Sequence, residues 1–294
     1  MGSKGIVYWL AEHPAIVGFR WSPDTSWGST WSFLISSITL FHAAALTLHL
    51  LLHLSGRRRP LPLGPIPVLH SLAMALASAA IFLGILLSSA AEIRDTRWFW
   101  SRTKTSTPLH WLLCFPVGTR PSGRVFFWSY AFYLSRFLHL LRSFFSILRR
   151  RPNASFRLFA HSASVLMSFL WLEFSQSVQV LAILSVTLAQ VVVFGYRFWV
   201  GVGLPAAHGA GFVVPLGCQL AVLSCNLVCH LVVLLLHYGR GGCNGIGASL
   251  FNSVLNGALL LIFLNVYVLQ RGVGEKNSGS GGGRWGGEHA RKEN

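Results

Sequence analysis

The chain is built from long apolar runs separated by short polar segments. Seven of the runs approach the ~20 residues that a helix needs to cross the hydrocarbon core of a bilayer. Charged residues gather between the runs rather than along one face of them. The pattern predicts an all-α polytopic membrane protein with about seven transmembrane helices. The expected spans are residues 29–54, 67–90, 125–148, 157–173, 177–200, 211–237 and 247–270.

Two segments differ in character from the spans. Residues 91–124 form a polar loop, and residues 271–294 are rich in glycine and charge, which is typical of a disordered tail. We therefore expect one membrane domain over residues 1–270. A soluble all-helical protein is disfavoured because only 11% of the residues are charged, whereas about a quarter is usual in soluble domains.

The charge of the chain predicts its orientation. Net charge is +16, and short arginine clusters at 57–59 and 149–151 stand at the ends of apolar runs. Cytosolic flanks of membrane spans are enriched in such residues, so we expect a lumenal N-terminus and a cytosolic C-terminus. The lipid bilayer and its anionic headgroups are the expected partners. No nucleic-acid-binding signature accompanies the charge, so nucleic acid is not expected.

The cysteines divide into two groups in this topology. Cys114 and Cys243 both fall in lumenal loops, which are oxidising, and we predict a disulfide between them. Cys218, Cys225 and Cys229 fall inside the sixth span and should stay reduced. Their spacing is not that of a zinc or redox motif, and no metal site is expected.

Three histidines of the first span share one helix face, since His42, His49 and His53 are spaced by seven and four residues. A metal or proton site and hydrogen bonds between packed helices are both consistent with this face, and we favour the hydrogen bonds. Di-iron membrane enzymes use several histidine boxes. The chain lacks them, so that class is excluded.

The third span carries Arg136, His139 and Arg142 at three-residue spacing. Arginines inside a membrane span require an anionic partner or must reach the interface. Glu173 is the acid nearest to a span, so acids within the protein are scarce. The arginines are therefore expected either to bind a phosphate of coenzyme A or of an anionic lipid, or to extend their side chains to the interface.

Five segments, in this order, resemble plant-type members of the fatty-acid-elongase (ELO) family. The most specific is LLCFPVGTRPSGRVFFWSYAFYLSR at 112–136. The others are YWLAEHP near the N-terminus, MSFLWL at 167–172, FGYRF at 194–198 and GCNG…FNSVLN at 242–256.

The resemblance implies a reaction and a place. Members of the family condense malonyl-CoA with a long-chain acyl-CoA to give a 3-ketoacyl-CoA, CO2 and CoA in the endoplasmic-reticulum membrane. The implied fold has seven helices, six of them around a tunnel for the acyl chain. No cofactor is implied, because acyl-CoA and malonyl-CoA are substrates. Other subunits of the elongation system are possible partners.

The family reaction relies on a histidine box, H-x-x-H-H, whose imidazoles serve as nucleophile and base. In this chain the box falls on Arg157, Leu158, Phe159, Ala160 and His161. Only the last histidine is kept. The middle position, which the resemblance implies is the acylated one, is Ala160, and its methyl group cannot attack a thioester.

The other family patterns are also altered. K-x-x-E-x-x-D-T falls on Arg136, His139, Arg142 and Ser143. H-x-x-M-Y-x-Y-Y falls on Gln190, Val193, Phe194, Tyr196 and Arg197. The later T-x-x-Q-x-x-Q pattern keeps Gln219 alone. The glutamine amide at 190 forms hydrogen bonds but does not titrate near neutral pH.

These assignments predict a candidate site with two groups of residues. The catalytic candidates are His161, His139 and Gln190, and the substrate-binding candidates are Arg136, Arg142, Tyr196 and Gln219. We expect an elongation-system protein whose condensing activity is impaired. The alternatives are condensation through a different constellation of these residues, and a non-catalytic acyl-binding or scaffold subunit. A seven-span receptor or carrier is a weaker third class.

Overall fold

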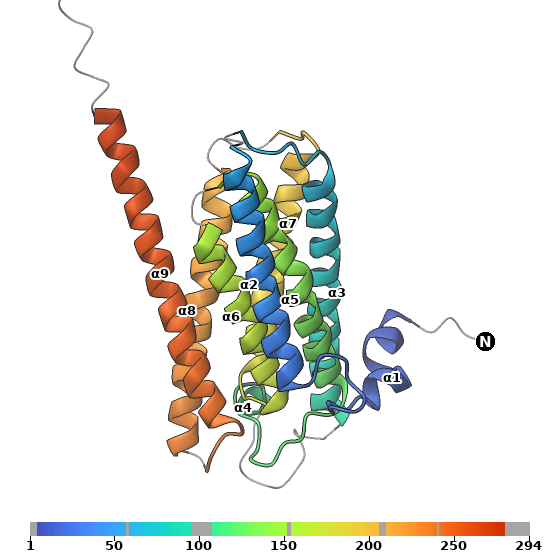
Figure 1. Ribbon diagram of the computed structural model, residues 1–294. Helices are drawn as coiled ribbons and strands as arrows, with labels where there is room; N and C mark the ends of the chain where they lie inside the picture. Colours follow the sequence, from blue (N-terminus) through green and yellow to red (C-terminus); the bar gives the residue numbers. More distant parts are fainter. Residues whose placement is uncertain are drawn as a thin grey trace, which may run out of the picture.

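The computed structural model describes residues 5–56, 59–95, 108–151, 154–205, 210–239 and 241–279. Within these residues it is helical and contains no strand, which confirms the predicted all-α class. The expected spans correspond to long helices (Figure 1). These are α2 (Trp31–Leu54), α3 (Ile66–Asp95), α5 (Arg124–Leu148), α6 (Ala154–Glu173), α7 (Gln179–Gly201), α8 (Ala210–Gly239) and α9 (Ile246–Gly279).

The helices belong to a multi-pass membrane protein. In the described part of the chain, α2, α3, α7, α8 and α9 are long and apolar enough to cross a bilayer by length and composition alone. The helices α5 and α6 have 25 and 20 residues but are not among the helices of that apolarity. Their polar side chains are the reason. Arg136 and several serines of α5 are buried in the bundle, so they do not face lipid.

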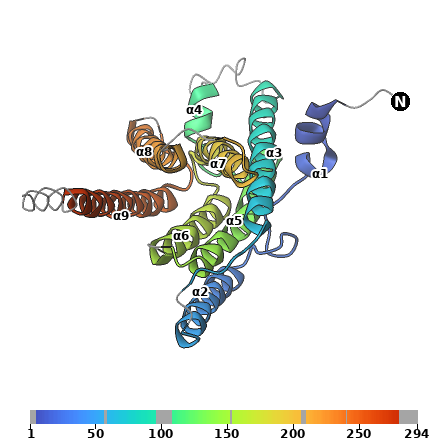
Figure 2. The same cartoon turned by 90° about the horizontal axis from the view of Figure 1, so that it is seen from above.

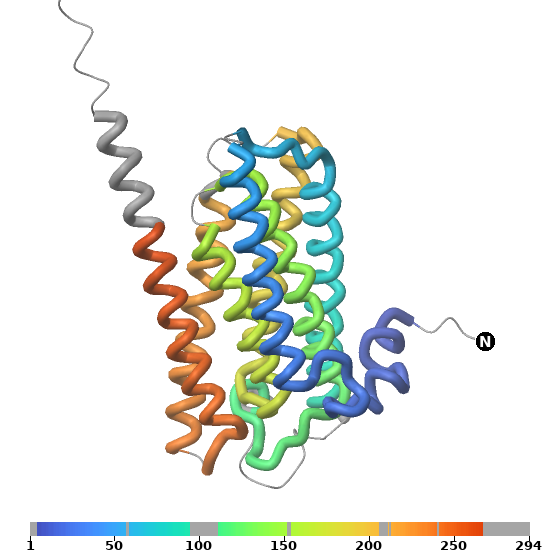
Figure 3. The backbone as a smooth tube through the Cα atoms, viewed as in Figure 1, coloured from blue at the N-terminus to red at the C-terminus, as the bar shows by residue number. Residues whose placement is uncertain are grey.

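The long helices run alternately up and down (Figures 1 and 3). Seen along the bundle, α3, α5, α6 and α7 form its centre, with α2 on one side and α8 and α9 on the other (Figure 2). We call the end where α2, α5 and α7 finish and α3, α6 and α8 begin the arginine end. The opposite end, with Cys114, the turn 174–178 and Cys243, is called the disulfide end.

Helix bounds differ from the sequence-based expectation at several points. The N-terminal segment forms one π-helical turn, Tyr8–Glu12, and the short α1 (Pro14–Val17). The expected loop 91–124 contains the end of α3 and all of α4 (Pro108–Leu113), while its residues 96–107 lie outside the described residues.

The helix α9 continues to Gly279, into the segment 271–294 that was expected as the tail. An established helix extends at little cost, since each added residue forms one more backbone hydrogen bond. The remainder of the expected tail, 280–294, lies outside the described residues.

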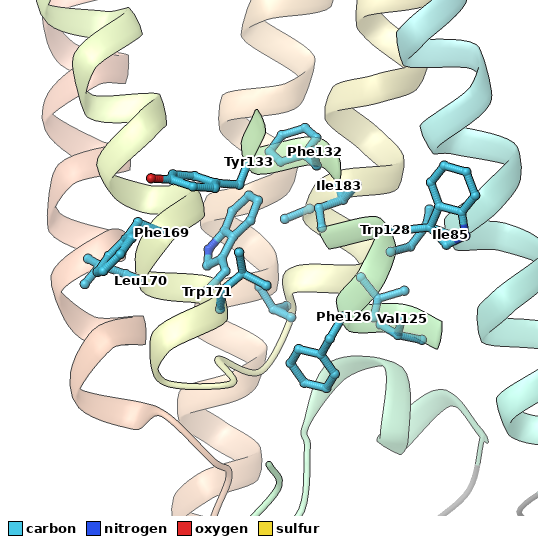
Figure 4. Close-up of a cluster of buried hydrophobic side chains, with 14 of the residues drawn as sticks. Ile85, Val125, Phe126, Trp128, Phe132, Tyr133, Phe169, Leu170, Trp171 and Ile183 are labelled. Carbon is cyan, nitrogen blue, oxygen red and sulfur yellow. The ribbon is translucent and has the colours of Figure 1, made fainter. Parts of the chain in front are cut away.

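Aromatic side chains fill the core between the central helices. Phe132 of α5 stacks on Trp171 of α6, with ring centroids 5.6 Å apart (Figure 4). Beside them Trp128 of α5 lies against α3 at Gly84, where any Cβ would overlap the indole ring. Gly84 thus permits a close approach of α3 and α5. This packing fixes α5, which carries Arg136, His139 and Arg142 of the predicted site.

Candidate functional site

Arg136 lies at the centre of the candidate site. Its side chain is 2% exposed, and its Nη2 donates hydrogen bonds to Gln190 Oε1 of α7 (2.8 Å) and to Ser135 Oγ (2.9 Å). Ser78 Oγ of α3 donates to the same glutamine oxygen (3.2 Å). Beneath the guanidinium, the Phe132 ring centroid is 4.0 Å from its central carbon. Three helices therefore hold one buried cation.

The neutral amide of Gln190 leaves that cation without a balancing charge. Arg136 Nε is buried and has no hydrogen-bond partner among the described residues. A buried arginine usually has a carboxylate or a ligand as its partner, because an isolated charge is costly in a low-dielectric environment. The site thus has an unused donor and an excess of positive charge.

A pair of histidines lies beside this cation. His139 of α5 and His161 of α6 have ring centroids 4.5 Å apart, and the Phe194 ring of α7 is 5.2 Å from that of His139. His139 Nε2 is buried without a hydrogen-bond partner in the described part of the chain. The structure therefore brings together the residues predicted as catalytic, His139, His161 and Gln190, around Arg136.

Toward the arginine end, three further arginines come from three helices. Arg142 of α5 and Arg197 of α7 lie by the Phe194 ring, with guanidinium carbons 5.6 and 5.8 Å from its centroid. Arg157 of α6 donates from Nη1 to Ser146 Oγ (3.1 Å). Ser146 Oγ in turn donates to Arg142 O (3.0 Å), so the three arginines are neighbours. The described residues place no carboxylate in an ion pair with any of them.

Arg197 was not predicted as a site residue. It was noted only as the last position of the altered H-x-x-M-Y-x-Y-Y pattern. Arg157 was noted only as a lost histidine. A signal was present: both arginines and Arg142 lie on spans close to the same predicted membrane face. Spacing within one helix could not reveal the group, since each residue comes from a different helix.

Two box positions face different sides of α6. Ala160 packs in a small apolar cluster with Leu223 of α8 and Leu259 of α9, whereas its neighbour His161 contacts His139 of α5. Successive helical residues point about 100° apart, so this division is expected. The methyl group of Ala160 is thereby turned away from the histidine pair.

Two of the predicted substrate-binding residues lie apart from the others. Gln219 is exposed on α8. Tyr196 is half-buried on α7, and its hydroxyl lies near Gly211 of α8. Among the described residues, neither has a recorded side-chain hydrogen bond with the buried arginine or the histidine pair. Their roles in binding stay predictions.

The disulfide end is closed by covalent and hydrogen bonds. Cys114 and Cys243 are joined by a disulfide, with Cα atoms 5.1 Å apart and a sequence separation of 129. Cys218, Cys225 and Cys229 are free thiols on α8. In the described part of the chain, no group of three or more histidine, cysteine or acidic side chains is arranged to hold a metal ion.

Comparison with known proteins agrees with the sequence and the fold. Residues 26–271 match the model of the ELO: GNS1/SUR4 family. The chain is 61% identical to a fatty acid elongase 3-like protein of Arabidopsis thaliana, over 94% of this chain and 96% of that protein. It is 21% identical to the fatty acid elongase sre1 of Dictyostelium discoideum, over 56% of this chain and 57% of sre1. No solved structure matches the chain. The protein belongs to the ELO family of fatty-acid elongases.

Proposed function

We propose that this ELO-family chain binds a long-chain acyl-CoA in very-long-chain fatty-acid elongation and does not condense it by the family's histidine route. The observation that carries the proposal is the buried Arg136, whose acceptor from a neighbouring helix is the neutral amide of Gln190 (2.8 Å). A fixed guanidinium with an unused donor is suited to the carbonyl oxygen or the anionic groups of an acyl thioester.

The loss of condensation is supported by the chemistry at two positions. A condensing histidine must attack the thioester carbonyl, release the CoA thiol and transfer its acyl group to the carbanion that forms as malonyl-CoA loses CO2. Ala160 has no nucleophilic atom and packs toward α8 and α9. Gln190 accepts hydrogen bonds from Arg136 and Ser78 and cannot exchange a proton near neutral pH.

A second function has one specific observation in its favour. The rings of His139 and His161 lie 4.5 Å apart, so one imidazole could attack the thioester while the other carries the proton. The adjacent Arg136 would stabilise the developing oxyanion. In this version the chain condenses acyl groups with a relocated pair of histidines.

Expression in cells that lack their own elongases separates the two functions. The readout is the acyl-chain length profile of the unaltered chain, a His161→Ala variant and an Ala160→His/Gln190→His double variant. Our proposal predicts no elongation by the unaltered chain, together with binding of a long-chain acyl-CoA by the purified protein. Elongation that is lost in the His161→Ala variant would establish the relocated pair instead.

We further propose an endoplasmic-reticulum location, with the disulfide end in the lumen and the arginine end toward the cytosol. The Cys114–Cys243 bond supports this orientation because disulfides persist in oxidising compartments. In this setting the chain would act as an acyl-binding or scaffold subunit beside an active elongase. Elongation that requires co-expression of an active elongase, and rises with this chain, is the expected result.

A further inference from the structure

The strongest unexplained feature outside the acyl-thioester site is the group formed by Arg142, Arg157 and Arg197. We propose that these three arginines, here called the arginine triad, form a binding site for a phosphate group carried on an amphipathic molecule. If the phosphate belongs to coenzyme A, the inference rests on the proposed acyl-CoA binding and extends it; if it belongs to a membrane lipid headgroup, the inference goes beyond that function.

The charge balance of the triad is the first argument. Arg142 and Arg197 lie over the same Phe194 ring, and Arg157 is linked to Arg142 through Ser146, so three like charges are neighbours. The ion pairs in the described part of the chain lie elsewhere and join Arg94 to Glu12 and Arg124 to Glu92. Three cations held together inside a membrane bundle require an anion, because the low dielectric amplifies their repulsion.

The geometry of the triad is the second argument. Its members come from α5, α6 and α7, and Ser146 Oγ of α5 links two of them by accepting from Arg157 Nη1 (3.1 Å) and donating to Arg142 O (3.0 Å). The guanidinium carbons of Arg142 and Arg197 both lie over the Phe194 ring, 5.6 and 5.8 Å from its centroid. Arg157 is fixed by its bond to Ser146 Oγ. Arginine donors pair with phosphate oxygens in a bidentate manner, and a phosphate offers enough oxygens for several guanidiniums.

The family pattern does not imply this site. In the resemblance, the triad positions correspond to an aspartate, the first histidine of the box and a tyrosine. All three are arginine in this chain. The site is therefore a property of this chain's own residues rather than of the reaction that the family pattern describes.

The test uses the purified full-length protein in detergent micelles and direct binding measurements. The probes are coenzyme A, dioleoyl phosphatidate, dioleoyl phosphatidylcholine and oleate. We expect at least one phosphate monoester ligand, coenzyme A or phosphatidate, to bind more tightly than phosphatidylcholine or oleate. Binding should weaken as salt is added. Phosphatidate alone would assign the site to a lipid headgroup, and coenzyme A alone would assign it to the acyl carrier.

Variants then test the residues. Single changes Arg142→Gln, Arg157→Gln and Arg197→Gln should each weaken binding by about 10- to 100-fold, as expected for a lost hydrogen bond to a charged group. Arg197→Lys keeps the charge and should lose less. Arg94→Gln is the matched control, since it removes one positive charge at the disulfide end, where Arg94 pairs with Glu12.

Stability provides an independent measurement. Because like charges repel, each glutamine variant should unfold at the wild-type temperature or above it when no ligand is present. The proposal is overturned if the wild-type protein binds neither coenzyme A nor phosphatidate, if oleate competes equally, or if the three glutamine variants bind as tightly as the Arg94→Gln control. The comparison of the four probes on the wild-type protein tests the proposal even if a variant fails to fold. None of these outcomes depends on whether the chain elongates acyl groups.

Discussion

The two ends of the bundle differ in whether their polar and charged groups have partners within the protein. At the disulfide end, Asn244 donates its amide hydrogens to Phe174 O and Ser175 O (3.0 and 3.1 Å) and accepts from Gly118 N (3.1 Å). Ser177 Oγ accepts from Phe115 N and donates to Asn244 O. At the arginine end, the triad has no carboxylate partner in the described part of the chain.

The difference indicates a division of labour. Saturated hydrogen bonds and a disulfide hold loops together, and their value is stability. Clustered charges without counterions lower stability, and the proposed phosphate would supply the missing charge at the arginine end. Changes at the disulfide end should therefore affect unfolding, and changes at the arginine end should affect binding.

The largest effect is expected from removal of the disulfide. Cys114→Ser should lower the free energy of unfolding by about 2–4 kcal/mol, because the bond closes a long loop. Thermal unfolding of the purified protein, with and without reductant, measures the change. Cys225→Ser, which alters a free thiol on α8, should leave the midpoint unchanged. Equal unfolding midpoints for the two variants would show that the disulfide does not stabilise the protein.

Loss of the acceptor for Arg136 should rank next. Gln190→Leu leaves a buried guanidinium without its 2.8 Å partner on α7 and should cost about 2–3 kcal/mol. The isosteric Gln190→Glu keeps an acceptor oxygen and should cost less. Chemical denaturation of the three proteins gives the comparison. A leucine variant as stable as the parent would mean that the buried cation needs no acceptor.

Asn244→Ala should destabilise the disulfide end by about 2 kcal/mol, because several backbone groups lose their partner at once. Hydrogen exchange should rise in the turn 174–178 and stay unchanged around Arg142. The exposed Thr47, whose hydroxyl donates to Ala43 O within α2, provides the control Thr47→Ala. Exchange that rises equally at both ends would show that the two regions unfold as one unit.

The smallest effect concerns α2. His42 Nε2 lies 2.8 Å from Ser162 Oγ of α6, so Ser162→Ala should cost about 1 kcal/mol in the free energy of unfolding. The same contact agrees with the expectation of hydrogen bonds between packed helices. Thermal unfolding of Ser162→Ala beside Ser36→Ala, which loses a hydroxyl bonded within α2, measures the difference. If only Ser36→Ala lowered the unfolding temperature, the predicted contribution of the His42–Ser162 contact would be contradicted.

The sequence predicted the long helices well because a bilayer sets their length and composition. It was less informative about short elements such as α4, which lies within the segment expected as a loop and whose length is not set by the thickness of a bilayer. For the site, the spacing of Arg136 and His139 placed them on one face of α5, and the histidine-box resemblance pointed to His161. The partner of Arg136 on α7 and the location of Arg197 depend on how three helices pack, which periodicity within one helix does not specify.

The disulfide also constrains the order in which this protein is made. Cys114 leaves the ribosome 129 residues before Cys243, and α5, α6, α7 and α8 are synthesised in the interval. The covalent link can form only after those four helices exist. A chain that terminates before residue 243 would leave Cys114 without its disulfide partner.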